Sequence, residues 1–250
     1  GASLGAQAAD IKASGLWQHR VSWADRNFEK GNHDDNFRAA SRFRTQIDVI
    51  ASENLKGVVF FEIGHQNWGY TSQGASLGTD GKEVKVRYSY VDWVVPNTDA
   101  RVRVGLQKYT LPNFTGIGSP ILDADAPGIS IHNQFTPNVG TNLFWLRAAN
   151  DNDPDRAVNN AHDAMDFAGL SVPLTFDGVK VTPWGMFGVI GRDSFKGGNF
   201  DLGTIATQGL LPLKATAAIV ADSDDTHGQA WYGGIAADIT YFDPFRIAFD

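Results

Sequence analysis

Positively charged side chains recur at every second position in three segments of the chain. The six residues are Arg42, Arg44, Lys85, Arg87, Arg101 and Arg103. Alternate residues of a β-strand point to the same face, so each segment places its cations on one face. Two carboxylates, Asp123 and Asp125, follow in a long connection and would face this basic surface if that connection folds inward. Opposed charges across a narrow, water-filled space orient polar solutes and select them by size and charge.

Other interpretations of these residues remain open. The cations also fit a solvated or salt-bridged face that plays no part in selecting solutes, and the two aspartates also fit an ordinary surface loop.

Residue patterns that support catalysis or metal binding are scarce. The chain has no cysteine, which excludes disulfides, thiolate zinc sites and cysteine nucleophiles. Its six histidines form no i, i+4 pair, and neither a Gly-x-Ser-x-Gly motif nor a phosphate-binding loop is present. Acidic clusters at 151–155 and 222–225 have oxygen ligands spaced as in a calcium loop, but neither follows the EF-hand pattern. We therefore expect no enzyme activity and no cofactor.

Composition places the chain among ordinary globular proteins. Of its 250 residues, 42% are hydrophobic and 20% are charged. The formal net charge of -7 argues against nucleic acid as a partner, because such proteins neutralise phosphates with basic residues. The longest apolar runs, 57–61 and 217–221, are far shorter than the roughly 18 residues of a spanning helix. A spanning β-strand needs only about 9–11 residues of alternating polarity, so a membrane location stays possible.

Period-2 alternation recurs along almost the whole chain and predicts an all-β fold. In the clearest segment, Phe43, Thr45 and Ile47 share one face while Arg42 and Arg44 share the other. The expected strands are 10–24, 37–51, 55–66, 83–95, 100–109, 128–135, 139–149, 164–175, 179–191, 229–241 and 245–250.

The connections between these strands alternate between short and long. Short turns are expected at 52–54, 96–99, 136–138, 176–178 and 243–244, and long loops at 25–36, 67–82, 110–127, 150–163 and 192–228. A meander with its short turns at one end and its long loops at the other is typical of outer-membrane barrels. The sequence therefore predicts an antiparallel up-and-down transmembrane β-barrel, with the apolar rows facing lipid and the arginine rows facing water.

Aromatic residues gather near the expected strand ends, as membrane-interface girdles require. Those at the long-loop end are Trp23, Phe37, Trp68, Tyr109, Trp145 and Trp231, and those at the short-turn end are Trp93, Phe135, Phe176, Tyr241 and Phe245. A general preference of aromatic residues for strands is the alternative explanation.

The two ends of the sequence suggest a segment of a longer precursor. Ala6-Gln7-Ala8 fits a signal-peptidase site, so residues 1–8 are predicted to be the remnant of a signal peptide. About eleven strands are expected here, whereas bacterial single-chain barrels have an even number. Residues 9–250 are therefore interpreted as the N-terminal part of one barrel domain.

Several stretches resemble the homotrimeric outer-membrane porins of sulfate-reducing bacteria. They are residues 9–17, 42–48, 52–57, 90–96 and 142–148. The resemblance implies a trimer in the bacterial outer membrane, embedded in its lipid, with about sixteen strands in each barrel. It also implies passive diffusion of small hydrophilic solutes and ions past a constriction made by the third long loop, here 110–127. The alternative function is a secreted all-β carbohydrate-binding module, and an outer-membrane enzyme has the least support.

Overall fold

The computed structural model describes residues 10–25, 35–79, 81, 83–116, 118–150, 164–191 and 228–250. In these segments the chain forms twelve strands and one 3-10 turn, η1 (Thr71–Gln73). The strands are β1 (Asp10–Asp25), β2 (Asp35–Ser52), β3 (Leu55–Asn67), β4 (Lys85–Val94), β5 (Arg101–Thr110), β6 (Asp123–Thr136), β7 (Val139–Asn150), β8 (Ala164–Ser171), β9 (Leu174–Phe176), β10 (Val179–Ile190), β11 (Gly228–Ile239) and β12 (Ile247–Phe249). None of the described residues belongs to a helix that could span a bilayer.

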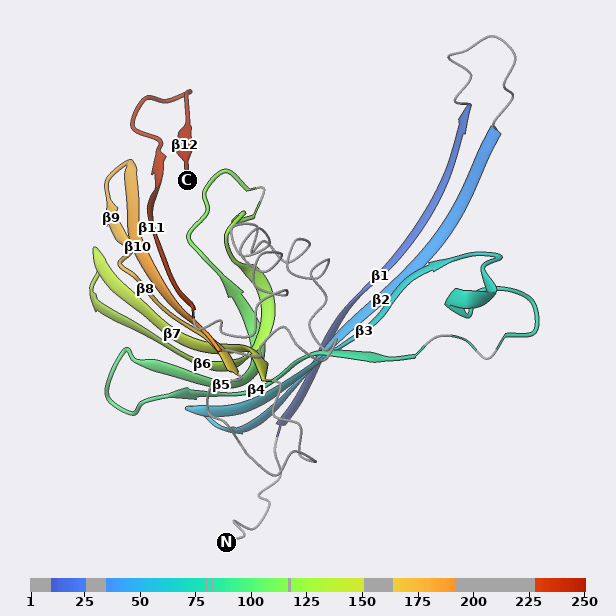
Figure 1. Cartoon of the computed structure of the whole chain (residues 1–250), viewed down its shortest axis with the longest axis horizontal. Helices are drawn as coiled ribbons and strands as arrows, with labels where there is room; N and C mark the ends of the chain where they lie inside the picture. The colour runs from blue at the N-terminus through green and yellow to red at the C-terminus, as the bar shows by residue number, and fades with distance from the viewer. Residues whose placement is uncertain are drawn as a thin grey trace, which may run out of the picture. The chain divides into compact units, whose positions relative to one another are not determined.

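All of these strands belong to one antiparallel up-and-down sheet (Figure 1). Strands β1 to β8, β10, β11 and β12 follow one another in chain order, and β9 pairs with β10 and β7. The predicted all-β meander is therefore confirmed. The eleven expected strands match the observed ones to within a few residues, except for the predicted strand 164–175 and the start of β6.

One exception is the predicted strand 164–175, which is divided into β8 and β9 at Pro173. Proline has no backbone N–H to donate to a strand ladder, so the ladder is interrupted there. Val172 N instead donates to Pro183 O at 3.0 Å, and Pro173 O accepts from Gly140 N at 3.0 Å. These bonds keep the interrupted strand in the sheet.

The predicted alternation of short and long connections is confirmed by the strand bounds. Short connections join β2 to β3, β4 to β5, β6 to β7, β9 to β10 and β11 to β12, and the long ones include 68–84 and 111–122. Residues 26–34, 151–163 and 192–227, with both acidic clusters, lie outside the described residues. In the short turns, Asn97 and Gly178 take the left-handed backbone with φ of 61° and 68°, which these residue types adopt readily.

The chain divides into two compact units, residues 1–89 and 90–250, which are described separately. In the first unit, β1 and β2 pair so that Trp17 lies opposite Phe43, with ring centroids 4.8 Å apart. Ile47 lies opposite Val59 of β3 on the same face. This face is apolar and accessible, with Trp17 72% exposed. The predicted division of 41–49 into an apolar and a charged face is confirmed.

In the second unit, apolar side chains cover one face of the sheet from β5 to β11 without being buried. Paired rows include Ile129 opposite Trp145 and Ile131 opposite Leu143. The exposed members of this face are Val104, Ile129, Ile131, Leu143, Trp145, Leu170, Val189, Trp231 and Ile235. We call this surface the outer face of the second unit.

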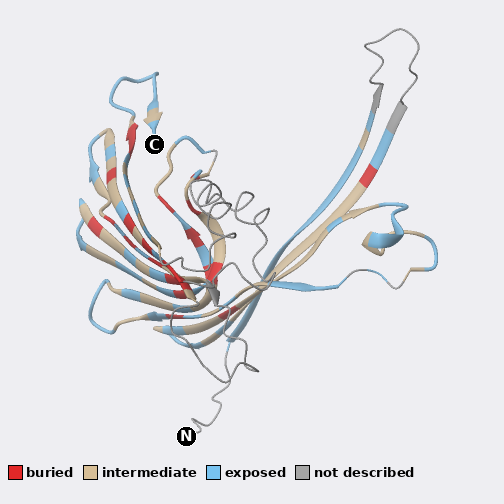
Figure 2. Ribbon diagram, in the orientation of Figure 1, coloured by how far each residue is buried: buried red, intermediate tan, exposed pale blue. Residues whose placement is uncertain are grey.

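The opposite face of the second unit, the inner face, carries the main core (Figure 2). Its buried members are Tyr109, Leu111, Leu122, Ala126, Leu146, Met165, Phe167, Met186 and Ile190. Leu111 and Leu122, directly after β5 and before β6, continue the inward-facing positions of these two strands. Toward the long-loop end the inner face is therefore apolar, because side chains of β7, β8 and β10 in this cluster point inward there.

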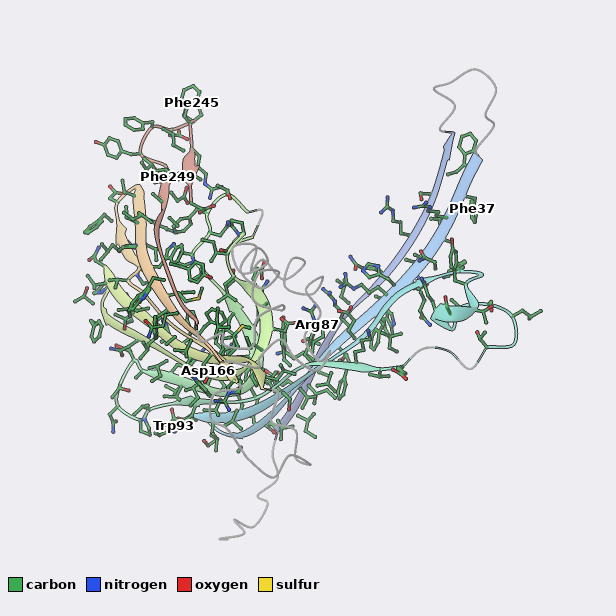
Figure 3. The ribbon with its side chains drawn as sticks, viewed as in Figure 1. Phe37, Arg87, Trp93, Asp166, Phe245 and Phe249 are labelled. Atoms are coloured by element: carbon green, nitrogen blue, oxygen red, sulfur yellow. The ribbon has the colours of Figure 1, made fainter. Side chains whose placement is uncertain are left out.

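The predicted aromatic positions are exposed with one exception (Figure 3). Phe37 is 67% exposed near the start of β2, Trp93 is 42% exposed near the end of β4, and Phe245 is 72% exposed before β12. Tyr109 instead points to the inner face and is 4% exposed. Ten of the eleven side chains are therefore accessible.

We expect Phe167→Ala to lower the free energy of unfolding by about 3–5 kcal/mol, because truncating a buried aromatic residue leaves a cavity. Phe167 is 0% exposed, and its ring lies against Gly188. Denaturant titration in detergent micelles measures the change. A shift of the unfolding midpoint, with the dependence of the free energy on denaturant concentration unchanged, reports the loss of stability. The control is Phe176→Ala, at the end of β9, where the side chain is 55% exposed. Equal losses in the two variants would show that the inner cluster is not a packed core.

Candidate functional site: arginine clusters on the polar strand faces

Three arginines of the first unit share the carboxylate of Glu62. Arg44 on β2 lies directly opposite Glu62 on β3, and its Nε donates to Oε2 at 2.6 Å. Arg42 occupies the same face two residues earlier, and its Nη2 donates to both carboxylate oxygens at 3.2 and 3.3 Å. Arg87 of β4 adds a donor, Nη1, at 3.3 Å. The register between β2 and β3 places Arg44 opposite Glu62, and alternation puts Arg42 on the same face.

In the Glu62 cluster, three guanidinium groups share the one carboxylate of Glu62. The Glu62 side chain is 13% exposed, whereas those of Arg42, Arg44 and Arg87 are 23–30% exposed. Among the described residues, no group accepts a hydrogen bond from the buried Nε of Arg42. The cluster is therefore a partly hydrated basic surface whose one carboxylate is saturated.

The same polar face continues in both directions along β1 and β2. Toward the short-turn end, Asp48 accepts from Lys56 Nζ at 3.1 Å and from Gln46 Nε2 at 2.7 Å. Toward the long-loop end, a groove of about 820 Å³ is lined by residues that include Arg20, Arg38 and Arg42. Cations thus follow most of the length of this strand pair.

The second unit has its own cluster, built on Asp92 of β4. This residue is 3% exposed, and its Oδ2 accepts from Arg103 Nη2 at 3.0 Å. Arg101 Nε lies 3.5 Å from Oδ1. The guanidinium of Arg103 also lies over the ring of Tyr90, 4.3 Å from its centroid, which adds a cation–π attraction. Burial of Asp92 is tolerated because two cations compensate its charge.

Neutral polar side chains extend this cluster across the inner face. Ser130 Oγ donates to Gln107 Oε1 at 2.7 Å. Further along the sheet, His132 Nδ1 bonds to Asn142 Oδ1, and Asn142 Nδ2 donates to Ser171 Oγ at 3.2 Å. The inner face is therefore polar toward the short turns and apolar beneath the loop 111–122.

The structure divides the predicted basic residues between the two clusters. Arg87 shares Glu62 with Arg42 and Arg44, whereas Arg101 and Arg103 share Asp92. Lys85, at the start of β4, is exposed.

Asp123 and Asp125 are not loop residues opposite the arginines, so that expectation is wrong. Strand β6 begins at Asp123, five residues before the predicted start at 128. The register pairs Asp125 with Lys108, whereas Ala126 pairs with Gln107, which shares the face of Arg103. Alternation therefore directs both aspartates to the outer face, where Asp123 Oδ1 lies 2.9 Å from Lys108 Nζ.

Sequence reasoning did not single out Glu62 and Asp92, the carboxylates at the centres of the clusters. Glu62 ends the run Val58-Val59-Phe60-Phe61, and Asp92 stands between Val91 and Trp93. A single acidic residue inside an apolar strand is itself a signal, because a buried charge needs a compensating partner.

The fold and these clusters define an antiparallel all-β protein with arginine clusters on one sheet face and accessible apolar rows on the other. The apolar rows are accompanied by the ion pairs Lys108–Asp123 and Arg147–Asp166. No family model matches the chain, and no curated protein matches it. In the part of the chain that the structure describes, no three His, Asp or Glu side chains are placed to hold a metal ion.

Proposed function

We propose that the chain forms the wall of a water-filled channel in the bacterial outer membrane, a porin through which small hydrophilic solutes and ions diffuse passively. One observation carries the proposal. Apolar rows on one sheet face are accessible, while the Glu62 and Asp92 clusters lie on the other. Apolar surface of this extent is unfavourable in water and favourable against acyl chains.

The arrangement of the strands supports a lipid-facing sheet over a soluble sandwich. In a sandwich, the apolar face of one sheet packs against the apolar face of a second sheet. All twelve described strands belong to one sheet, and Leu143, Leu170 and Trp231 remain 48%, 46% and 74% exposed.

The polar face supplies the groups that such a channel needs. The Glu62 and Asp92 clusters hold arginine side chains in fixed positions, and fixed charges in an aqueous passage impose a field on passing solutes. The loop 111–122 covers part of the same inner face as the Asp92 cluster and would narrow the passage there. Transport of this kind needs no chemical turnover and no cofactor. A homotrimeric assembly is part of the proposal and rests on the sequence resemblance.

Planar-bilayer recording of the full-length protein tests this function. Stable, ohmic conductance steps from protein purified in detergent are expected. The absence of steps from correctly folded protein would refute the channel. A protein that is monodisperse in buffer without detergent and binds oligosaccharides would instead support the carbohydrate-binding alternative.

A further inference from the structure

The carboxylate of Asp250, directly after β12, is held by the tip of the β5–β6 connection. Its Oδ1 accepts from the backbone N–H of Phe114 at 2.6 Å. Its Oδ2 accepts from Thr115 N at 3.2 Å, from Thr115 Oγ1 at 2.5 Å and from Asn113 Nδ2 at 2.9 Å. Four donors therefore surround one carboxylate that is 135 residues away from Thr115 in the sequence.

A second hydrogen bond joins the same two segments, and here the donor lies in the C-terminal segment and the acceptor in the loop. Arg246 Nη2 donates to Phe114 O at 3.1 Å, while its Nε donates to Asp238 Oδ1 at 2.6 Å. Asp238 lies on β11, so Arg246 ties the loop backbone to the body of the sheet. Both the amide and the carbonyl of Phe114 are thus engaged by the C-terminal segment.

The loop is shaped to receive a carboxylate. Asn113 Oδ1 accepts from Gly116 N at 2.9 Å, and Asn113 Nδ2 donates to Gly118 O at 2.8 Å. Gly116 has φ of 83°, a left-handed conformation that favours glycine. This tight turn directs the amides of Phe114 and Thr115 toward one point, and successive amides of this kind form an anion-binding concavity.

The base of the loop is held separately, by apolar packing. Leu111 and Leu122 are 2% and 1% exposed within the inner cluster, and Leu111 N donates to Leu122 O at 3.1 Å. Without a contact at its tip, residues 112–121 would be fixed at this base alone.

We infer that Asp250 is a latch whose ionised carboxylate fastens the tip of the loop 111–122 to the end of β12 and holds the loop over the inner face of the second unit. Charge-assisted hydrogen bonds are the strong class, and four of them converge here. The latch does not depend on the proposed channel function. Within a channel, it would keep the width set by the loop constant.

The titration of Asp250 agrees with this geometry. Partial burial acts to raise its pKa, but the bonds from Thr115 and from the amides of Phe114 and Thr115 outweigh it and lower the pKa below the ordinary 3.8. A lowered pKa means that the latch stabilises the fold above about pH 4 and is lost as the pH falls through the folded-state pKa. The charged groups nearby are Arg246, Asp238 and, beside Gly118, Asp123.

Hydrogen–deuterium exchange of the full-length protein in detergent tests the latch, because it reports on the backbone amides that bond to Asp250. We expect Asp250→Ala to speed exchange of the Phe114 and Thr115 amides about tenfold or more, with exchange in β7 and β8 unchanged. The matched control, Asp177→Ala, alters an exposed turn of the same unit and should leave both amides as in the parent. Identical exchange in Asp250→Ala and the parent would overturn the inference.

Two further variants decide the matter if Asp250→Ala does not fold. Asp250→Asn keeps the shape but removes the charge, and Thr115→Val removes one donor while keeping Asp250. Both should speed exchange of the Phe114 amide relative to the parent. Full protection of that amide in both variants would overturn the latch.

Discussion

Leu143→Arg is expected to lower the free energy of unfolding in a lipid bilayer by about 2–4 kcal/mol, the cost of an arginine at mid-depth on a lipid-facing strand. Leu143 is 48% exposed on the outer face and lies in register between Ile131 of β6 and Leu170 of β8. Its neighbours offer the guanidinium no polar partner, so the cost is one of desolvation.

Equilibrium unfolding of the full-length protein in phospholipid vesicles, followed by tryptophan fluorescence, measures this loss. Thr141→Arg is the matched control, because Thr141 lies on the same face of β7 but close to its short-turn end. There the cost should be only about 0–1 kcal/mol. If Leu143→Arg changed stability by less than about 0.5 kcal/mol, as at a water-exposed site, the outer face would not meet lipid.

Glu62→Gln is expected to lower the free energy of unfolding by about 2–4 kcal/mol. Removing one partner from a buried ion pair costs about 3–5 kcal/mol, and the partial hydration of this cluster reduces that figure. The substitution leaves Arg42, Arg44 and Arg87 close together with no carboxylate between them. Their mutual repulsion adds to the weakening of four charge-assisted hydrogen bonds.

Denaturant midpoints in detergent micelles report this change, with Glu53→Gln at the exposed β2–β3 turn as the control. The double variant Glu62→Gln/Arg44→Gln should recover part of the stability, because it removes one repelling charge along with the carboxylate. A double variant that loses the full sum of the two single effects would show that Glu62 is not the shared centre of the cluster.

The strands, the turns and the division of strands into two faces could be predicted from the order of residues alone. These are local properties. Apolar and polar residues alternate in any strand that has one apolar face, as at Phe43, Thr45 and Ile47. Turn residues such as Asn97 and Gly178 mark reversals through their own backbone preferences. The order of short and long connections followed directly from these signals.

Contacts between side chains of different strands could not be predicted in this way. The register between β2 and β3 places Glu62 opposite Arg44. The register between β5 and β6 places Asp123 on the face opposite to that of Arg103. The latch joins Thr115 to Asp250 across 135 residues. A register is set by pairing between strands, and such contacts leave no periodic signal in either segment alone. The apolar core of the inner face has the same origin, because it joins side chains of different strands, from Tyr109 of β5 to Ile190 of β10.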